Sequence, residues 1–169
     1  MNRAGRSGVT IETTRADADV EKFFALYARI AVVKGFRVVG SVSLMKHLLA
    51  APAGAAVEAQ LFVARHSESV AAGALVIRCG RSIHGVWQGT DRAFSRERVG
   101  EAVQWALIEW ALSRDCVLFD QEGVDPHNNP SGYAFKQKLG GEEIILEGRQ
   151  YLPCSARGHL ITWLDQYFR

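Results

Sequence analysis

The feature that most constrains the fold of this chain is a change in the period of its apolar residues. Segments 59–66, 70–79 and 83–89 take a period of two and are separated by short turns, which predicts an antiparallel meander of three strands. Gly85 and Gly89 in the third segment predict a bulge or a close backbone approach. The helical spacing over 97–114 then predicts a long helix, and the apolar run 116–120 predicts a buried strand parallel to the third.

The flanking segments complete the predicted order of elements. Before the meander we expect a strand over 9–13, a helix that Asp17 or Asp19 caps and that ends at Lys34 and Gly35, and a shorter helix from Ser41 or Ser43. Three further elements are expected after the buried strand: a helix over 130–139, a strand over 143–152 and a helix over 160–168. This order predicts an α/β fold, with a mixed sheet that joins an antiparallel meander to a parallel αβαβ half and has helices on both faces.

Length and charge limit the function classes. With 169 residues, we expect a flexible tail over 1–8 and a single domain over 9–169. Lys and Arg number 20 against 18 for Asp and Glu, which gives a net charge of +2. With so small a charge we expect only weak binding to a nucleic acid. Because there is neither an apolar run of membrane length nor a signal peptide, we expect a cytoplasmic protein.

The cysteines and histidines carry no metal motif. Cys79, Cys116 and Cys154 stand far apart without a C-x-x-C pair, and we expect them to be buried reduced thiols. The histidines have neither H-x-x-x-H nor mixed carboxylate spacing, so we expect no metal site. They are His47, His66, His84, His127 and His159.

The predicted order of elements is similar to the GNAT superfold. That resemblance implies an acyl donor in the splay between strands 83–89 and 116–120. The superfold usually binds acetyl-CoA through a Q/R-x-x-G-x-G/A turn at the start of the helix after the meander, where backbone N–H groups hold the pyrophosphate. Here Gly100 and Ala102 fit that turn, but Glu97 and Glu101 place two carboxylates beside the pyrophosphate and oppose its binding.

A more specific pattern lies downstream. Asp120-Gln-Glu-Gly and then Gly132, Phe135, Lys136, Gly140 and Gly141 match, in spacing, a strand ending in D-x-G-G followed by G-[ILV]-x-x-F-K-x-x-F-G-G. With the meander and long helix, this resembles the Fem family of peptidoglycan interpeptide-bridge aminoacyltransferases over residues 18–150. Three residues depart from the pattern: Glu122 replaces a glycine, Tyr133 an aliphatic residue and Leu139 a phenylalanine.

The Fem resemblance implies a reaction and its partners. Such an enzyme transfers an amino acid, here alanine, glycine or serine, from aminoacyl-tRNA to a free amine of a peptide, forming a peptide bond. Family members usually carry two such domains, and this chain resembles the second. One domain implies a small acceptor, such as a peptidyl-nucleoside antibiotic, or else a cell-wall precursor. No cofactor is expected beyond the aminoacyl-tRNA donor substrate.

Three residues are the predicted catalytic groups. The donor ester is already activated, so the enzyme must supply a neutral acceptor amine and stabilise the oxyanion. Lys136, to which the resemblance points, is predicted to donate to that oxyanion or to hold a phosphate of the tRNA end. Asp120 is predicted to take a proton from the acceptor ammonium, and Glu122 to bind the acceptor amine.

Five other residues are predicted to bind substrate. Phe135 forms a wall of the acceptor channel or stacks on the terminal adenine, with Tyr133 from the same motif beside the substrate. Trp87 and Gln88 are expected to line the channel from the splayed strand, and Asp91 follows that strand.

Two other functions remain open from the sequence. One is an acetyl-CoA-dependent N-acetyltransferase, which needs the turn that Glu97 and Glu101 weaken. The other is a non-catalytic GNAT-like module that binds a partner chain. The oligomeric state is open.

Overall fold

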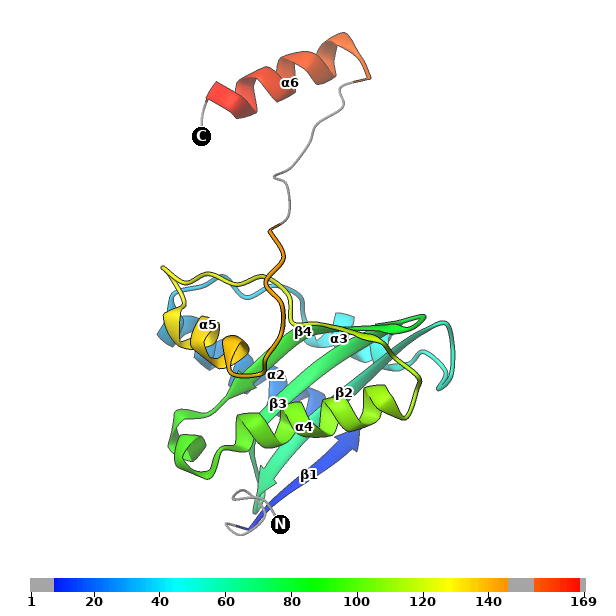
Figure 1. The fold of residues 1–169 in the computed structure, drawn as a ribbon, viewed down its shortest axis with the longest axis vertical. Coiled ribbons are helices and arrows are strands. Elements are labelled where there is room, and N and C mark those ends of the chain that lie inside the picture. Colours follow the sequence, from blue (N-terminus) through cyan, green and yellow to red (C-terminus); the bar gives the residue numbers. More distant parts are fainter. Residues whose placement is uncertain (1–7, 146–153, 168–169) are drawn as a thin grey trace. The chain divides into compact units, whose positions relative to one another are not determined.

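A five-stranded sheet organises the first part of the chain. A computed structural model describes residues 8–145 and 154–167, and the chain divides into two compact units, Met1–Ala134 and Phe135–Arg169. In the first unit the strands follow one another in sequence order across the sheet (Figure 1). They are β1 (Val9–Thr14), β2 (Val57–His66), β3 (Ser69–Cys79), β4 (Ser82–Thr90) and β5 (Leu118–Asp120). Strands β1 to β4 pair antiparallel, whereas β5 pairs parallel to β4, which confirms the predicted mixed sheet.

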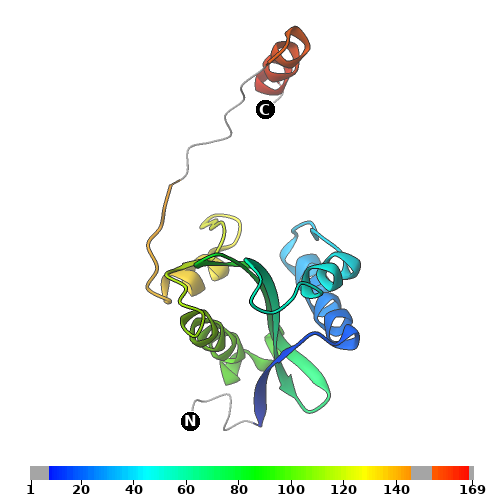
Figure 2. The same ribbon diagram turned by 90° about the vertical axis from the view of Figure 1, so that its right-hand side faces the viewer.

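Helices cover both faces of this sheet, as predicted. Figure 2 shows α2 (Asp17–Lys34) and α3 (Val42–Leu49) on one side and α4 (Val99–Leu112) on the other. The alternation of strand side chains creates the two faces. Leu61 and Val63 are buried with α2 and α3, whereas Phe62 and Ala64 are buried with α4. The sheet therefore separates two apolar cores.

The ends of α2 and α3 follow local chemistry. Neither Asp17 nor Asp19 caps α2, because Ala16 holds the N-cap position without a side-chain hydrogen bond. Asp19 instead accepts a hydrogen bond from Thr14 Oγ1 at 2.6 Å and pairs with Arg65. Helix α2 ends where Gly35 takes a left-handed conformation with φ of 71°. At α3, the Ser41 side chain accepts from the backbone N–H of Leu44, which confirms one of the two predicted starts.

The segments after the meander differ more from prediction. The expected helix over 97–114 is divided at Arg98, where φ of 56° separates the 3₁₀ helix η1 (Arg92–Glu97) from α4. Strand β5 has three residues instead of five and is partly exposed, because no strand of the described sheet covers its other edge. Helix α5 (Pro130–Gln137) is two residues shorter than predicted, and α6 (Ala156–Tyr167) begins four residues earlier.

Several predictions fall at the limits of the described residues. Residues 143–145 form no strand, and the rest of the strand predicted to Leu152 lies outside the described residues. Of the predicted tail, only Gly8 is described, and the single domain over 9–169 stays a prediction. Cys116 is buried but Cys79 and Cys154 are exposed, so two of the three thiols were wrongly predicted to be buried. Within 8–145 and 154–167, no helix is long and apolar enough to cross a membrane.

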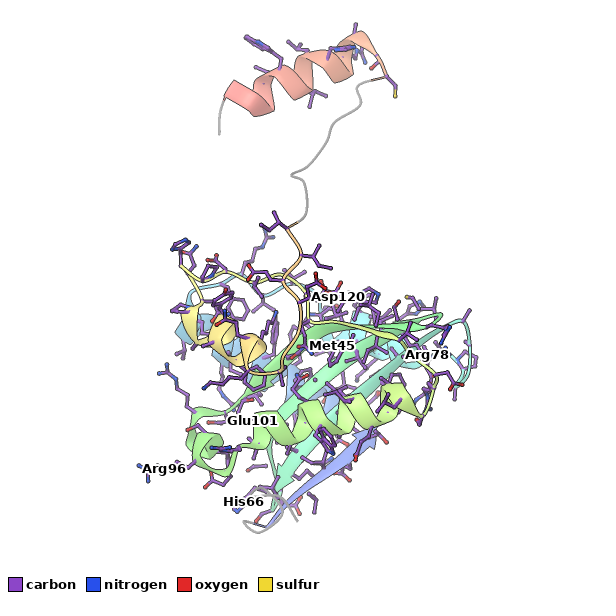
Figure 3. All side chains as sticks on the ribbon, viewed as in Figure 1. Met45, His66, Arg78, Arg96, Glu101 and Asp120 are labelled. Carbon is purple, nitrogen blue, oxygen red and sulfur yellow. The ribbon has the colours of Figure 1, made fainter. Side chains whose placement is uncertain are left out.

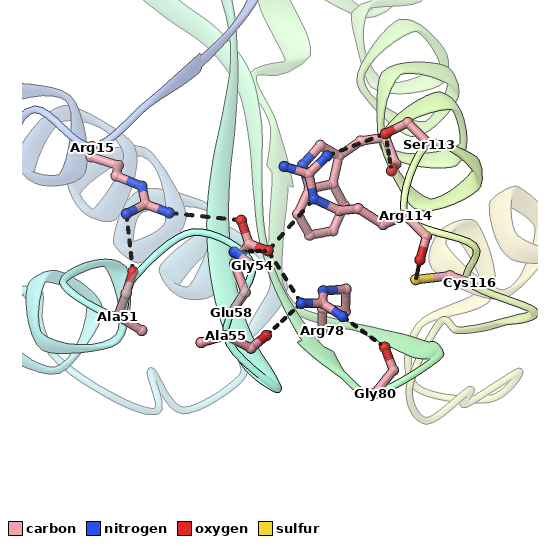
Figure 4. A network of polar contacts seen from close by, with 11 residues as sticks. Arg15, Ala51, Gly54, Ala55, Glu58, Arg78, Gly80, Ser113, Arg114 and Cys116 are labelled. Atoms are coloured by element: carbon pink, nitrogen blue, oxygen red, sulfur yellow. Dashed lines mark hydrogen bonds and ion pairs between the residues drawn. The ribbon is translucent and has the colours of Figure 1, made fainter.

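A buried carboxylate ties the two faces together at one end of the sheet. Glu58, near the start of β2, faces the guanidinium groups of Arg78 and Arg114 at 3.5 Å and that of Arg15 at 3.8 Å (Figure 4). One of its oxygens also accepts a hydrogen bond from the backbone N–H of Gly54 at 3.2 Å. The three arginines come from the segment before α2, from β3 and from the end of α4. Glu58 therefore connects elements of both faces through one side chain.

Candidate functional site

The candidate site lies where β4 and β5 stop pairing, a place we call the β4–β5 junction. The parallel pairs are Ser82 with Leu118, Ile83 with Phe119, and His84 with Asp120, and there the pairing ends. Strand β4 continues to Thr90 without a partner on this side in the described sheet. The antiparallel register confirms the predicted irregularity, since Leu75 pairs with Trp87 and Ile77 with His84, leaving one extra residue in β4.

Three titratable side chains meet at this junction, and we call them the junction cluster: His84, Asp120 and Glu122. His84 Nδ1 lies 3.5 Å from Asp120 Oδ2 and 3.8 Å from Glu122 Oε1. Asp120, labelled in Figure 3, is the last residue of β5. His84 is partly buried and the two carboxylates are exposed, so solvent and small molecules reach the cluster. The structure thus brings together two of the predicted catalytic residues, Asp120 and Glu122.

The turn after β5 fixes the position of Glu122. Asp120 Oδ1 accepts a hydrogen bond from the backbone N–H of Glu122 at 2.7 Å, which leaves Oδ2 directed toward His84. Glu122 has φ of 61°, a conformation that favours glycine. Glu122 adopts this conformation although it carries a side chain, and that side chain belongs to the cluster.

Sequence reasoning missed His84. Its spacing from the other histidines carries no information, because its neighbours in the cluster lie 36 and 38 positions further along the chain. The signal that was available is the predicted parallel pairing of segments 83–89 and 116–120. That pairing places the two strands side by side but does not set their register, and the structure shows the register that pairs His84 with Asp120.

A chain of three glutamine amides runs beside the junction. Gln121 Nε2 donates to Gln104 Oε1 at 3.2 Å, and Gln104 Nε2 donates to Gln88 Oε1 at 2.6 Å. Gln88 Nε2 in turn donates to the carbonyl of Gly85 at 3.2 Å, where a Cβ atom would collide with this amide. Gln104 is only 3% exposed, so the chain is a buried polar contact between α4, β4 and the turn after β5. Gln88, predicted to line the channel, belongs to this chain.

Two other predicted binding residues have structural roles in the first unit. Trp87 is buried against α2 and α3, and its Nε1 donates to the carbonyl of Val39 at 2.8 Å. Its ring therefore anchors the loop before α3 instead of lining a channel. Asp91 caps η1 by accepting from the backbone N–H of Ala93 at 2.9 Å, and it lies 3.5 Å from Arg29. Its carboxylate therefore holds the end of β4 to α2.

The remaining predicted residues lie on α5. Tyr133 is half-buried in the first unit, and its backbone N–H donates to the carbonyl of Asn129. Phe135 and Lys136 are half-buried and belong to the second unit, which is described by itself. The roles proposed for these three side chains stay predictions.

The start of α4 offers backbone donors. Its N-cap residue, Arg98, is left-handed and makes no side-chain hydrogen bond to the first turn. Helix N-terminal N–H groups without a side-chain cap attract anions. Glu101 lies in that turn and Arg96 points outward from η1 (Figure 3). Arg92, Arg96 and Arg98 are all exposed, whereas Glu97 is partly buried.

Comparison with known proteins identifies the family. The family described as "Acetyltransferase (GNAT) domain" matches residues 1–127, which is most of the chain and includes the meander, α4 and the junction cluster. This chain belongs to the GNAT acetyltransferase family. The GNAT fold inferred from the order of elements is thereby confirmed, and an acyltransferase is the class of enzyme that it indicates.

Solved structures share this GNAT fold at low sequence identity. An aminoglycoside acetyltransferase from an uncultured soil metagenomic sample, in complex with sisomicin, has a TM-score of 0.63 and 14% identity over 87% of this chain and 98% of its own. A GNAT-family acetyltransferase from Staphylococcus aureus Mu50 has a TM-score of 0.66 and 12% identity, covering 81% and 86%. A ribosomal-protein-alanine N-acetyltransferase from Brucella melitensis biovar Abortus 2308 has a TM-score of 0.60 and 13% identity, covering 85% and 99%.

The comparisons identify no substrate for this protein. No curated protein matches the sequence. The solved structures show the fold alone, and nothing in the comparisons is specific to the Fem family. Acetyl transfer, which the sequence left as the alternative, is therefore better supported than transfer from aminoacyl-tRNA.

Proposed function

We propose that this GNAT protein is an N-acetyltransferase that moves an acetyl group from acetyl-CoA to a primary amine of a small molecule or peptide. The observation that carries the proposal is the place of the junction cluster: His84 and Asp120 form the last residue pair before β4 and β5 part, and Glu122 lies in the turn that follows. Membership of the acetyltransferase family supports the donor. Two of the solved structures with this fold are an aminoglycoside acetyltransferase and a ribosomal-protein-alanine N-acetyltransferase, and both names support an amine as acceptor.

The first turn of α4 is the proposed holding site for the donor's pyrophosphate. The backbone N–H groups of Val99, Gly100 and Glu101 lie at an end without a side-chain cap, where the helix dipole favours an anion. When bound, acetyl-CoA supplies an acetyl group that its thioester already activates.

The junction cluster is the proposed site for the acceptor amine. Two carboxylates favour binding of an ammonium group, and the His84 imidazole is the proposed acceptor of a proton from it. The amine nitrogen then forms a bond to the acetyl carbon as the carbon–sulfur bond breaks. The nitrogen gives up its second proton to the departing thiolate, so the products are the amide, the CoA thiol and the proton held at His84, which passes to solvent. Asp120 keeps the imidazole in place through Oδ2, while its Oδ1 holds the turn.

Aminoacyl transfer is the second candidate because one motif favours it. The glycine-flanked Phe135 and Lys136 match the Fem family's spacing and have no assigned place in acetyl transfer. In that hypothesis Lys136 meets the donor's oxyanion or a tRNA phosphate. The weak net charge of +2 predicts that tRNA binding would fall with added salt from an already modest level.

A donor assay separates the two candidates. The purified chain is incubated with acetyl-CoA or with alanyl-, glycyl- or seryl-tRNA, each with an aminoglycoside, an alanine-initiated peptide and a uridyl peptide as acceptors. Release of CoA thiol with an acetylated product, unaffected by ribonuclease, is the expected result. Product formed only from charged tRNA and abolished by ribonuclease would instead select the Fem-like function. If no donor gives product, neither transfer function holds, and the non-catalytic module remains.

Variants then test the junction cluster. His84→Ala removes the proton acceptor and should lower kcat/KM about 100-fold or more, while His47→Ala, a change at an exposed histidine, should not. Asp120→Asn should also reduce activity, and Asp115→Asn is its matched control on the exposed turn before β5. Equal activity of His84→Ala and wild type would remove His84 from the mechanism.

A further inference from the structure

The junction cluster has the composition of a metal site as well as of a proton acceptor. We propose that His84, Asp120 and Glu122 bind one divalent transition-metal ion, such as Zn²⁺. The ligand atoms are one imidazole nitrogen and two carboxylate oxygens, and all three lie within 4.8 Å of one another. They come from two paired strands and the turn that follows, so the fold itself gathers them.

The distances fit a single ion. Nitrogen and oxygen ligands lie about 2.0–2.2 Å from Zn²⁺, so two ligands of a tetrahedral site are about 3.3–3.6 Å apart. The separations of His84 Nδ1 from Asp120 Oδ2 and Glu122 Oε1, 3.5 and 3.8 Å, are at or just beyond that value. The separation of 3.8 Å exceeds the tetrahedral value by about 0.2 Å, so binding of the ion requires Glu122 Oε1 to move that far toward His84.

The surroundings prepare two of the ligands. Asp120 Oδ1 is engaged by the backbone N–H of Glu122, so Oδ2 is presented on the side of His84. The same hydrogen bond holds the left-handed turn that brings Glu122 back toward the strand. Outer contacts of this kind orient ligands and raise metal affinity. Because both carboxylates are exposed, water has access to a fourth position, as in open zinc sites.

The ligand set selects a class of ion. Imidazole nitrogen suits Zn²⁺, Cu²⁺, Ni²⁺ and Co²⁺, whereas Mg²⁺ and Ca²⁺ prefer oxygen ligands alone. A site with one histidine and two carboxylates therefore favours the transition metals. The sequence predicted no metal site because the histidines lack the usual spacing, and the cluster forms through strand pairing instead.

Metal binding has a consequence for the proposed acyl transfer, and this consequence rests on the proposed function. A bound cation occupies the groups that would receive the acceptor's ammonium and its proton. The ion therefore inhibits acyl transfer in competition with the acceptor amine and not with the donor. Removal of the ion by a chelator restores activity.

Direct binding tests the site without any enzyme assay. Zn²⁺ is titrated into the full chain by calorimetry, and one ion per chain is expected. His84→Ala and Glu122→Gln should each weaken binding about 10-fold or more, because losing a ligand costs at least as much as losing an outer contact. His47→Ala and Asp115→Asn, which alter exposed residues away from the cluster, should bind Zn²⁺ like the wild type.

Co²⁺ gives an independent measure on the unmodified chain. Its visible absorption should show a site of four or five ligands, and equimolar Zn²⁺ should abolish the band. Absence of Zn²⁺ binding by the wild type overturns the proposal, as does binding that persists in both His84→Ala and Glu122→Gln. Mg²⁺ bound as tightly as Zn²⁺ also overturns it. A chain that binds Zn²⁺ but shows no acyl transfer leaves the metal site standing and removes only the proposed function.

Discussion

Replacing Glu58 by glutamine is the sharpest test of what holds the two faces of the sheet together. Glu58 is 1% exposed, and its carboxylate is the shared partner of Arg15, Arg78 and Arg114. Glutamine keeps the shape and the acceptor oxygen for the Gly54 N–H but removes the charge. The substitution therefore isolates the ionic part of the network.

The size of the effect follows from the burial of each arginine. Removing one partner of a buried ion pair costs about 3–5 kcal/mol, because the other charge stays buried. Arg78 is 12% exposed, so loss of the Glu58 charge leaves its guanidinium buried and incurs that cost, although the carbonyls of Ala55 and Gly80 still accept hydrogen bonds from it. Arg15 and Arg114 are 38% and 34% exposed, and such pairs contribute about 0–1 kcal/mol. We expect a loss of about 3 kcal/mol in the free energy of unfolding.

Thermal and urea unfolding of Glu58→Gln measure this loss. For a chain of this size the expected change is a Tm lower by about 6–12 °C, at about 2–4 °C per kcal/mol. Arg15→Gln is the matched control, because its guanidinium is the most exposed and most distant of the three, and it should change stability by less than about 1 kcal/mol. A loss below about 1 kcal/mol in Glu58→Gln, or equal losses in both variants, would refute the reasoning.

The pH dependence of the difference in stability between the wild type and Glu58→Gln is a second measurement. Burial raises the pKa of Glu58, but the Gly54 N–H and the guanidinium groups of Arg114 and Arg78 outweigh it and hold this pKa below its ordinary value. A carboxyl whose folded-state pKa is depressed contributes stability above its unfolded value, and this contribution disappears as pH falls through the folded value. The wild type should therefore lose its advantage over Glu58→Gln only in acid.

Three other substitutions have defined outcomes. Gly73→Ala places a Cβ atom 2.6 Å from the ring of Phe23 and should cost about 1–3 kcal/mol by overpacking, measured in urea; an unchanged midpoint would contradict the tight contact. Gln104→Leu breaks the series of glutamine hydrogen bonds in a buried position and should lower the free energy of unfolding by about 1–3 kcal/mol, with faster backbone hydrogen exchange at α4. Stability equal to wild type would mean that these hydrogen bonds contribute nothing to the fold. Hydrogen bonds from Arg65 and Thr14 lower the pKa of Asp19, so the Tm difference between wild type and Asp19→Asn should be full at neutral pH and vanish below the ordinary value of 3.8; a difference that grows in acid would reverse the sign.

The sheet and its helices were predictable because their signals are local. A period of two marks β2, β3 and β4, and the long apolar stripe marks α4. The bulge in β4 could be inferred from Gly85, and the end of α2 from Gly35. Local signals also have limits: Asp19 was expected to cap a helix, but its carboxylate is taken by Arg65 from a strand 46 positions later.

The candidate site was only half predictable. Asp120 and Glu122 were found because they end a strand, whereas His84 joins them only through the pairing of β4 with β5. Trp87 was expected at the substrate because it lies on the splayed strand, and Asp91 because it directly follows that strand. Residue type does not indicate on which face of a bulged strand a side chain lies, and here the ring of Trp87 is buried in the core. Candidate titratable residues can thus be proposed from strand ends, whereas the contacts of the side chains around them are seen only in the structure.

The amide chain beside the junction has a fixed polarity. A backbone carbonyl only accepts, so Gly85 obliges Gln88 to present its nitrogen, and Gln88 must then turn its oxygen toward Gln104. The same rule passes the orientation on to Gln121. One carbonyl on a bulge therefore determines which end of an amide faces the turn that carries Glu122. The hydrogen bonds thus fix the orientation of each side-chain amide from strand β4 to the turn after β5 without any charged group. A glutamate in place of Gln88, Gln104 or Gln121 would remove an N–H donor and break this series of hydrogen bonds.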